Sequence, residues 1–170
     1  MDVFFYLIMR ESHQIICAKI KGRSMDTLLS GIDYVVYSSS NCYRIGQIVV
    51  YNTSSNTIAH RLLLKWQNCY LVAGDNCIRY EMIKKNRIVG KIDLIVKQRR
   101  VYILKQNMCN YILTGWVLII VFINRYITPY RKEKNRNRFQ LFCYRQNIKM
   151  RNRLQKHYLQ QCILKGSKEI

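Results

Sequence analysis

Short hydrophobic runs separated by polar turns dominate the first two thirds of the chain, and this pattern predicts β-strands. Between residues 12 and 105 the three-to-four spacing typical of helices is largely missing. The turns include SSSN, NTSSN and GDN, and the runs are QIICAKI, DYVVYS, GQIVVY, TIAHRLLLKW, CYLVA, RIVGKIDLIV and RRVYIL. We therefore predict a mainly β domain, an antiparallel coiled sheet or partly open barrel. Its clearest hairpin is joined by Asn52 to Asn56, which places His60 on the second strand.

The pattern changes at residue 106. Residues 106–124 carry no charge, and their strongly apolar part runs from Tyr111 to Ile123. The whole segment is long enough to cross a membrane, whereas its apolar part also fits a buried or interfacial helix. We expect an apolar helix here, either transmembrane or interfacial.

Residues 125–170 form a basic tail with helical spacing of apolar residues. Its apolar face is incomplete and flanked by cations. A solvated, partly disordered tail, a helix on an anionic membrane and a nucleic-acid-binding segment are the alternatives, and the last is disfavoured because no nucleic-acid-binding motif accompanies the charge.

Charge follows the same division of the chain. The net charge of +20 splits into +9 before residue 108, none in residues 108–124, and +11 after them. We accordingly expect three parts: a β domain over 1–105, the apolar helix over 106–124 and the basic tail over 125–170. This excess of positive charge favours anionic partners, and we expect membrane association through residues 106–170.

Cysteine usage argues against a metal or disulfide scaffold. The seven cysteines are an odd number, include no Cys-x-x-Cys pair and are not clustered with histidines. They indicate a reducing compartment, and no metal or other cofactor is expected. The N-terminal MDVFFYLIM lacks a basic start and a cleavage site, so we interpret it as a core strand or packing segment rather than a secretory signal.

Ser24, in the stretch KIKGRSMDTLLSG, is either a helix N-cap or a nucleophile. A serine nucleophile needs a base near neutral pKa, and His60 is the candidate. Asp75, in LVAGDNC, follows a further strand and could orient the imidazole as the third member of a triad. Taken one at a time, His60 can also be interpreted as an ordinary strand residue and Asp75 as a turn residue.

Together these blocks resemble the serine peptidase superfamily of type I signal peptidases and LexA-type self-cleaving repressors. The match covers about residues 16 to 96 and consists of GRSM, DYVVY, RIGQIVVY, IAHRLL, YLVAGDN and IVGKI, in that order. The resemblance implies Ser24 as nucleophile, His60 as general base, similar to the endoplasmic-reticulum, archaeal and SipW-like branch of signal peptidases, and Asp75 as the acidic residue associated with it. It also implies that Met25 packs beneath the serine and that Arg61 supports local structure.

Several positions depart from the family's pattern. Asp26 and Thr27 follow Ser-Met where proline and threonine are usual, and Gln47 replaces an aspartate. Gly22 stands where many signal peptidases have a serine that assists the oxyanion, so backbone N–H groups, first that of Ser24, must provide this stabilisation.

We therefore expect a serine endopeptidase that cleaves a signal or leader segment from a precursor. An extended peptide would pair with a strand edge beside Ser24, with small residues just before the cut. The chain is expected to be membrane-associated, with a cytoplasmic location as the alternative. The competing function is a catalytically silent β domain whose basic tail binds a membrane or nucleic acid. A self-cleaving regulator is disfavoured, because only about twenty residues precede Ser24.

Overall fold

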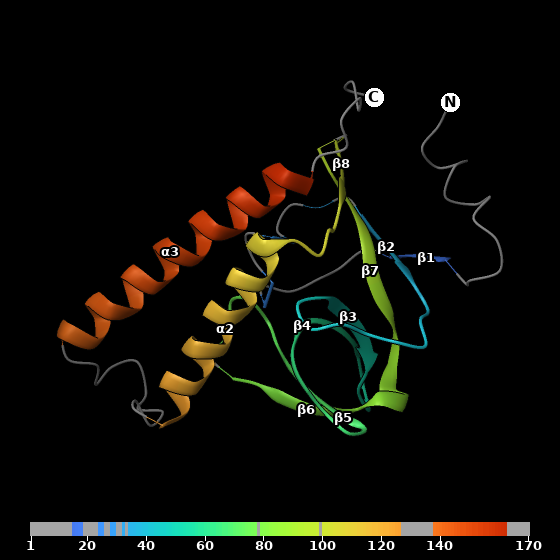
Figure 1. The fold of residues 1–170 in the computed structure, drawn as a ribbon, viewed down its shortest axis with the longest axis horizontal. Helices are drawn as coiled ribbons and strands as arrows, with labels where there is room; N and C mark the ends of the chain where they lie inside the picture. Colours follow the sequence, from blue (N-terminus) through green and yellow to red (C-terminus); the bar gives the residue numbers. More distant parts are fainter. Residues whose placement is uncertain are drawn as a thin grey trace.

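The computed structural model describes residues 15–18, 24–25, 28–29, 32, 34–77, 79–98, 100–126 and 138–162. Within these residues the fold is one antiparallel β-sheet with two long helices (Figure 1). The mainly β architecture expected from the hydrophobic runs is confirmed. The N-terminal segment MDVFFYLIM lies outside the described residues, so its expected packing role stays a prediction.

The described part of the sheet has eight strands in the order β1-β2-β7-β3-β4-β5-β6, and β8 pairs with β7. Every strand pair is antiparallel. The strands are β1 (Ile15–Ala18), β2 (Tyr34–Ser38), β3 (Ile48–Asn52), β4 (Thr57–Trp66), β5 (Cys69–Ala73), β6 (Glu81–Lys84), β7 (Ile88–Lys97) and β8 (Arg100–Ile103). Each of the seven predicted runs overlaps one strand, and β3 and β7 end one residue beyond their runs.

Strand β6 and the short 3-10 helix η1 (Lys85–Arg87) were not predicted. In β6 only Ile83 is buried, because the strand lies at the edge of the sheet beyond β5. A four-residue edge strand with one buried side chain leaves almost no hydrophobic pattern to read.

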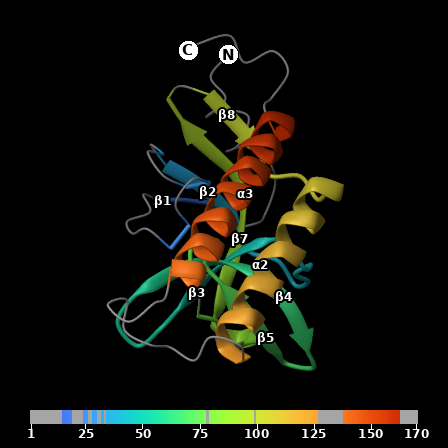
Figure 2. The same ribbon diagram turned by 90° about the vertical axis from the view of Figure 1, so that its left-hand side faces the viewer.

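The two helices, α2 (Met108–Tyr126) and α3 (Arg138–Cys162), lie on the same side of the sheet. Figure 2, which views the molecule from that side, shows both in front of the strands. Their buried side chains belong to the same core as those of the sheet. This cluster includes Val35, Val50 and Leu63 from strands, with Val117 from α2 and Tyr158 from α3.

Helix α2 forms where an apolar helix was expected, and one of its faces is in the core. Leu113, Val117 and Val121 are spaced four residues apart and are almost completely buried. Among the described residues, which include all of residues 106–124, no helix is both long enough and apolar enough to cross a membrane.

Residues 138–162 of the basic tail are helical, as the spacing of apolar residues in that part predicts. Within α3, Arg151, Gln155, Tyr158 and Cys162 are buried at spacings of four, three and four residues, which is one face of a helix. This face contacts the sheet and α2, since the Tyr158 hydroxyl donates a hydrogen bond of 2.9 Å to the carbonyl of Lys105. Two of its four residues are polar, which the sequence analysis did not foresee.

Candidate active site

Ser24 lies in a turn after β1, and its backbone is tied to the turn that follows β5. The Ser24 carbonyl accepts a hydrogen bond of 2.7 Å from the N–H of Asn76. Gly74 approaches so closely that a Cβ atom at this position would lie 2.5 Å from the Ser24 carbonyl oxygen and 2.8 Å from its Cβ. The Gly74-Asp75-Asn76 turn therefore fixes the position of the Ser24 backbone, and it can do so only with glycine at its start.

Met25 anchors the same turn from the core side. It is buried in the main cluster, and its Sδ accepts a hydrogen bond of 3.2 Å from the N–H of Asp75. Its carbonyl accepts a hydrogen bond of 2.8 Å from the N–H of Leu29. This i to i+4 bond begins at Met25, whereas the Ser24 carbonyl, which an N-cap would use for the first helical bond, accepts from Asn76.

His60 is buried on β4, where it pairs with Val49 of β3. Its Nδ1 lies 2.9 Å from the hydroxyl oxygen of Tyr51, and that hydroxyl donates its proton to Oε2 of Glu81 at 3.0 Å. With the Tyr51 hydroxyl proton directed at Glu81, the tautomer that fits the first contact is the one in which Nδ1 of His60 donates. The neutral ring then has an unprotonated Nε2, the form that a general base requires.

Burial lowers the pKa of His60 below its ordinary value of 6.5, and the negative charges of Glu81 and then Asp75 offset part of this effect. Burial and the hydrogen bond to Glu81 raise the pKa of Tyr51, so its hydroxyl stays protonated and continues to donate. His60 is consequently neutral and oriented near physiological pH.

The Asp75 carboxylate is held by Arg61 rather than by His60. Oδ1 and Oδ2 accept hydrogen bonds of 2.6 and 2.7 Å from Nε and Nη2 of Arg61, a bidentate geometry. Oδ2 also accepts a hydrogen bond of 2.9 Å from the side-chain amide of Gln155, and the Asp75 carbonyl accepts one of 3.1 Å from Arg151. All four of these residues are buried, at 7 % exposure or less.

Arg61 also connects this ion pair to α2. Its Nη1 donates to the carbonyl of Gly46 at 2.9 Å and to the side-chain oxygen of Asn110 in the first turn of α2. Gly46 has a φ of +90° and lies against the Asn110 amide, so glycine is required there for both reasons. The expected structural role of Arg61 agrees with these contacts.

Ser24 and Asp75 thus lie close together, joined by backbone contacts between their two turns. His60 is the residue before Arg61 on β4. Since side chains alternate along a strand, His60 and Arg61 point to opposite faces. Among the described residues, the hydrogen bond of the His60 ring goes to Tyr51 and not to Ser24 or Asp75.

The sequence analysis missed Tyr51, Glu81 and Gln155. Tyr51 had a readable signal: in the hairpin it pairs with Ile58, which places it diagonally across from His60 on the same face. Glu81 lies on the unpredicted strand β6. Gln155 lies on the predicted helix, but nothing in its polar surroundings marks it as buried.

Gln47, one of the positions that depart from the signal-peptidase pattern, has a structural role in the sheet. Its side-chain oxygen accepts a hydrogen bond of 2.8 Å from the N–H of Arg44 and so closes the turn before β3. Gly22, Asp26 and Thr27 lie outside the described residues. The described part of the chain contains no group of His, Cys, Asp and Glu side chains that could hold a metal ion.

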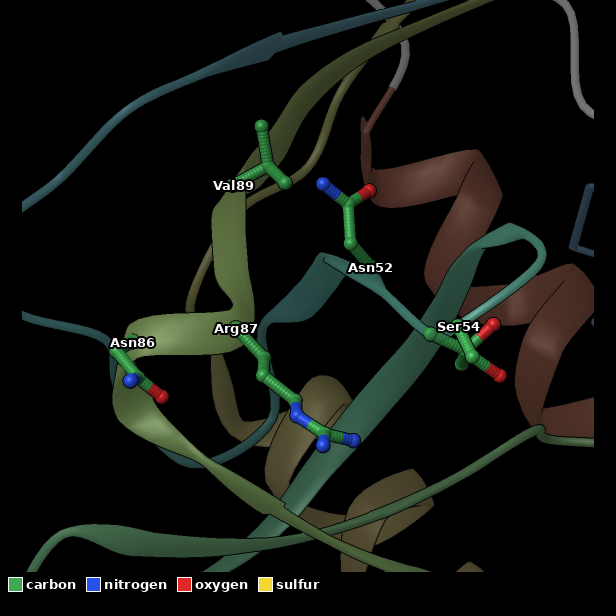
Figure 3. Close-up of a pocket in the computed structure, with 6 residues that line it drawn as sticks. Asn52, Ser54, Asn86, Arg87 and Val89 are labelled. Atoms are coloured by element: carbon green, nitrogen blue, oxygen red, sulfur yellow. The ribbon is translucent and has the colours of Figure 1, made fainter.

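A polar pocket of about 500 Å³ lies at the far end of the β3-β4 hairpin (Figure 3). It is lined by Asn52, Thr53, Ser54, Asn86, Arg87 and Val89. His60 lies three positions along β4 from Thr57, the residue paired with Asn52, so the pocket is roughly 10 Å away along the strand. None of the predicted catalytic residues lines it.

Comparisons of the chain with models of protein families, with curated proteins and with solved structures give no match.

Proposed function

We propose that this protein is a serine endopeptidase that removes a signal or leader segment from a precursor peptide, and that its sheet is of the signal peptidase and LexA type. The observation that carries the proposal is the chain of contacts from Nδ1 of His60 through the Tyr51 hydroxyl to the Glu81 carboxylate. In the tautomer that fits this chain, Nδ1 donates to Tyr51 and Nε2 can accept a proton.

In this mechanism Ser24 attacks the scissile carbonyl while Nε2 of His60 takes the hydroxyl proton. The proton then passes to the leaving amine, and water hydrolyses the acyl-enzyme by the same route. Glu81, through Tyr51, and Asp75, through its charge, favour the imidazolium that forms. The backbone N–H of Ser24 stabilises the oxyanion.

The resemblance to signal peptidases provides the substrate class: an extended peptide with small residues before the cut. Strands β1 and β6 are the two ends of the main path of the described sheet. An incoming peptide would add to such an edge through main-chain hydrogen bonds. Because Ser24 follows β1, we favour the β1 end.

The direct test uses a co-expressed precursor whose processing is read by mass spectrometry. Ser24→Ala and His60→Ala should each abolish cleavage, because one removes the nucleophile and the other its base. Tyr51→Phe should weaken cleavage by about ten- to a hundredfold, since the imidazole keeps its position but loses its orienting contact. Undiminished cleavage by Ser24→Ala would refute the peptidase proposal.

A membrane-surface role is the second proposal, and one face of α2 favours it. Six large apolar side chains on this helix are 40 % to 73 % exposed: Met108, Tyr111, Ile112, Ile119, Phe122 and Ile123. They recur at helical spacing, and Gly115 on the same face has no atom within 4 Å of its Cβ position. With a net charge of +20 and exposed cations on α3, the fitting partner is an anionic lipid surface.

Co-sedimentation with vesicles tests this surface. The full chain should bind phosphatidylglycerol-containing vesicles at low salt, and higher salt should weaken binding by screening. The double variant Ile119→Ser, Phe122→Ser should bind several-fold less, whereas Trp66→Ser, which removes a 74 % exposed side chain on β4, should bind normally. The absence of wild-type binding at low salt would overturn the proposal.

A further inference from the structure

Helix α3 makes a contact that a solvated tail or a membrane anchor does not need: two of its polar side chains are buried against Asp75. Arg151 donates to the Asp75 carbonyl, and Gln155 donates to the Asp75 carboxylate. The two residues are four positions apart, so they lie on one face of the helix. Gln155 has no exposed surface at all.

Burying such groups is costly, and the cost is offset only where each polar atom finds a partner. An apolar pair at these two positions would leave the Asp75 carbonyl and one of its buried carboxylate oxygens without these donors. The arginine and the glutamine therefore act on the Asp75 turn itself rather than on the apolar core. Their shared feature is that both hold the same residue, one at its main chain and the other at its side chain.

From Asp75 the contacts continue to Ser24. The N–H of the next residue, Asn76, donates to the Ser24 carbonyl, and the preceding residue, Gly74, is in close contact with the Ser24 Cβ. A shift of the Asp75 turn would thus move the Ser24 hydroxyl. In enzymes a displacement of about 1 Å at the reacting group can cost on the order of a hundredfold in rate.

We infer that α3 is part of the active-site scaffold, with Arg151 and Gln155 as positioning residues that hold the Asp75 turn and thereby place the Ser24 hydroxyl. This inference rests on the proposed peptidase function. Neither residue touches the reacting atoms, and both act through Asp75.

Single variants of the full chain test the inference, with cleavage of a fluorogenic peptide that has alanine before the cut as the readout. Arg151→Ala and Gln155→Met should lower kcat ten- to a hundredfold and change KM less than threefold, because the binding edge is untouched. Arg151→Lys keeps a donor and should recover part of the lost kcat. Arg153→Ala and Gln160→Ala, at exposed positions of the same helix, are the matched controls and should keep the wild-type kcat.

The outcomes distinguish the positioning role of α3 from the peptidase function on which it rests. If Ser24→Ala cleaves the peptide as fast as the wild type, or the wild type does not cleave, the peptidase proposal itself fails. If Ser24→Ala is inactive but Arg151→Ala and Gln155→Met keep the wild-type kcat, the positioning role is wrong. Should either of these two variants not fold, Arg151→Lys and Gln155→Asn decide, since each keeps a donor but places it differently and should therefore lower kcat in part. The positioning role would also be overturned if both conservative variants kept the wild-type kcat. The same holds if the control variants lost as much kcat as the test variants.

Discussion

At the scale of single residues, the tightest constraint in the site is at Gly74. The nearest atoms to its Cβ position are the Ser24 carbonyl oxygen and Ser24 Cβ, so nothing flexible can make room. Gly74→Ala should displace the serine and reduce cleavage at least a hundredfold, as measured by kcat on a peptide. Gly115→Ala, on the open face of α2, is the control and should keep full activity, because a helical alanine is favourable. Equal activity in the two variants would mean that Ser24 is not held by this turn.

The second prediction at this scale concerns pH. His60 works as a base only when neutral, so kcat/KM should fall as pH decreases through its pKa, which burial places below 6.5. Glu81 raises this pKa; neutralising it in Glu81→Gln should shift the acid limb to lower pH and reduce the plateau rate. A pH-rate profile measures both effects, with Asp93→Asn as a control on β7. A limb that moves to higher pH in Glu81→Gln would show that Glu81 does not act on the base.

At the scale of elements, continuous hydrophobic runs between turns predicted the strands, because the central strands are buried on both faces. In β4, Ala59, Arg61 and Leu63 face the helices and His60 and Leu62 face the other side, and all five are buried. The same pattern located α2, whose core face repeats every four residues. It failed for β6, where a short edge strand buries only Ile83.

The candidate site was predictable only in part, for a related reason. Ser24, His60 and Asp75 stand in recognisable local motifs, whereas the partners of these residues are fixed by contacts between distant segments. Gln155 is eighty positions from Asp75 in the chain. A sequence pattern indicates which face of a helix is apolar. A polar residue on a buried face is therefore predicted to be exposed to solvent.

The ion pair of Arg61 and Asp75 shows how elements are joined around the site. It connects β4 with the turn after β5, and Asn110 and Gln155 add one contact from each helix. Removing one partner of such a buried pair leaves an uncompensated charge, which typically costs about 3 to 5 kcal/mol. The pair therefore holds these elements together and also places the negative charge of Asp75 near His60.

At the scale of the whole molecule, composition and packing divide the chain differently. Charge and hydropathy separate residues 1–105, 106–124 and 125–170. The main core, however, draws on all three: Leu63 from the sheet, Leu113 from α2 and Tyr158 from α3 are each almost fully buried. The face of the sheet that carries this core needs a covering layer, and here the two helices provide it.

This packing predicts that the β domain does not fold without the helices. A chain ending at Lys105 loses the core side chains of α2 and α3. It also loses the hydrogen bond that Arg61 donates to Asn110 and the one that Gln155 donates to Asp75. It should show no cooperative thermal transition by circular dichroism and no cleavage, because the exposed apolar face and the incompletely paired charges both favour unfolding. The control is a chain that lacks only residues 163–170, which should unfold in one transition like the full chain. Cooperative unfolding and full activity of residues 1–105 would instead identify the sheet as an independent domain that the helices merely cover.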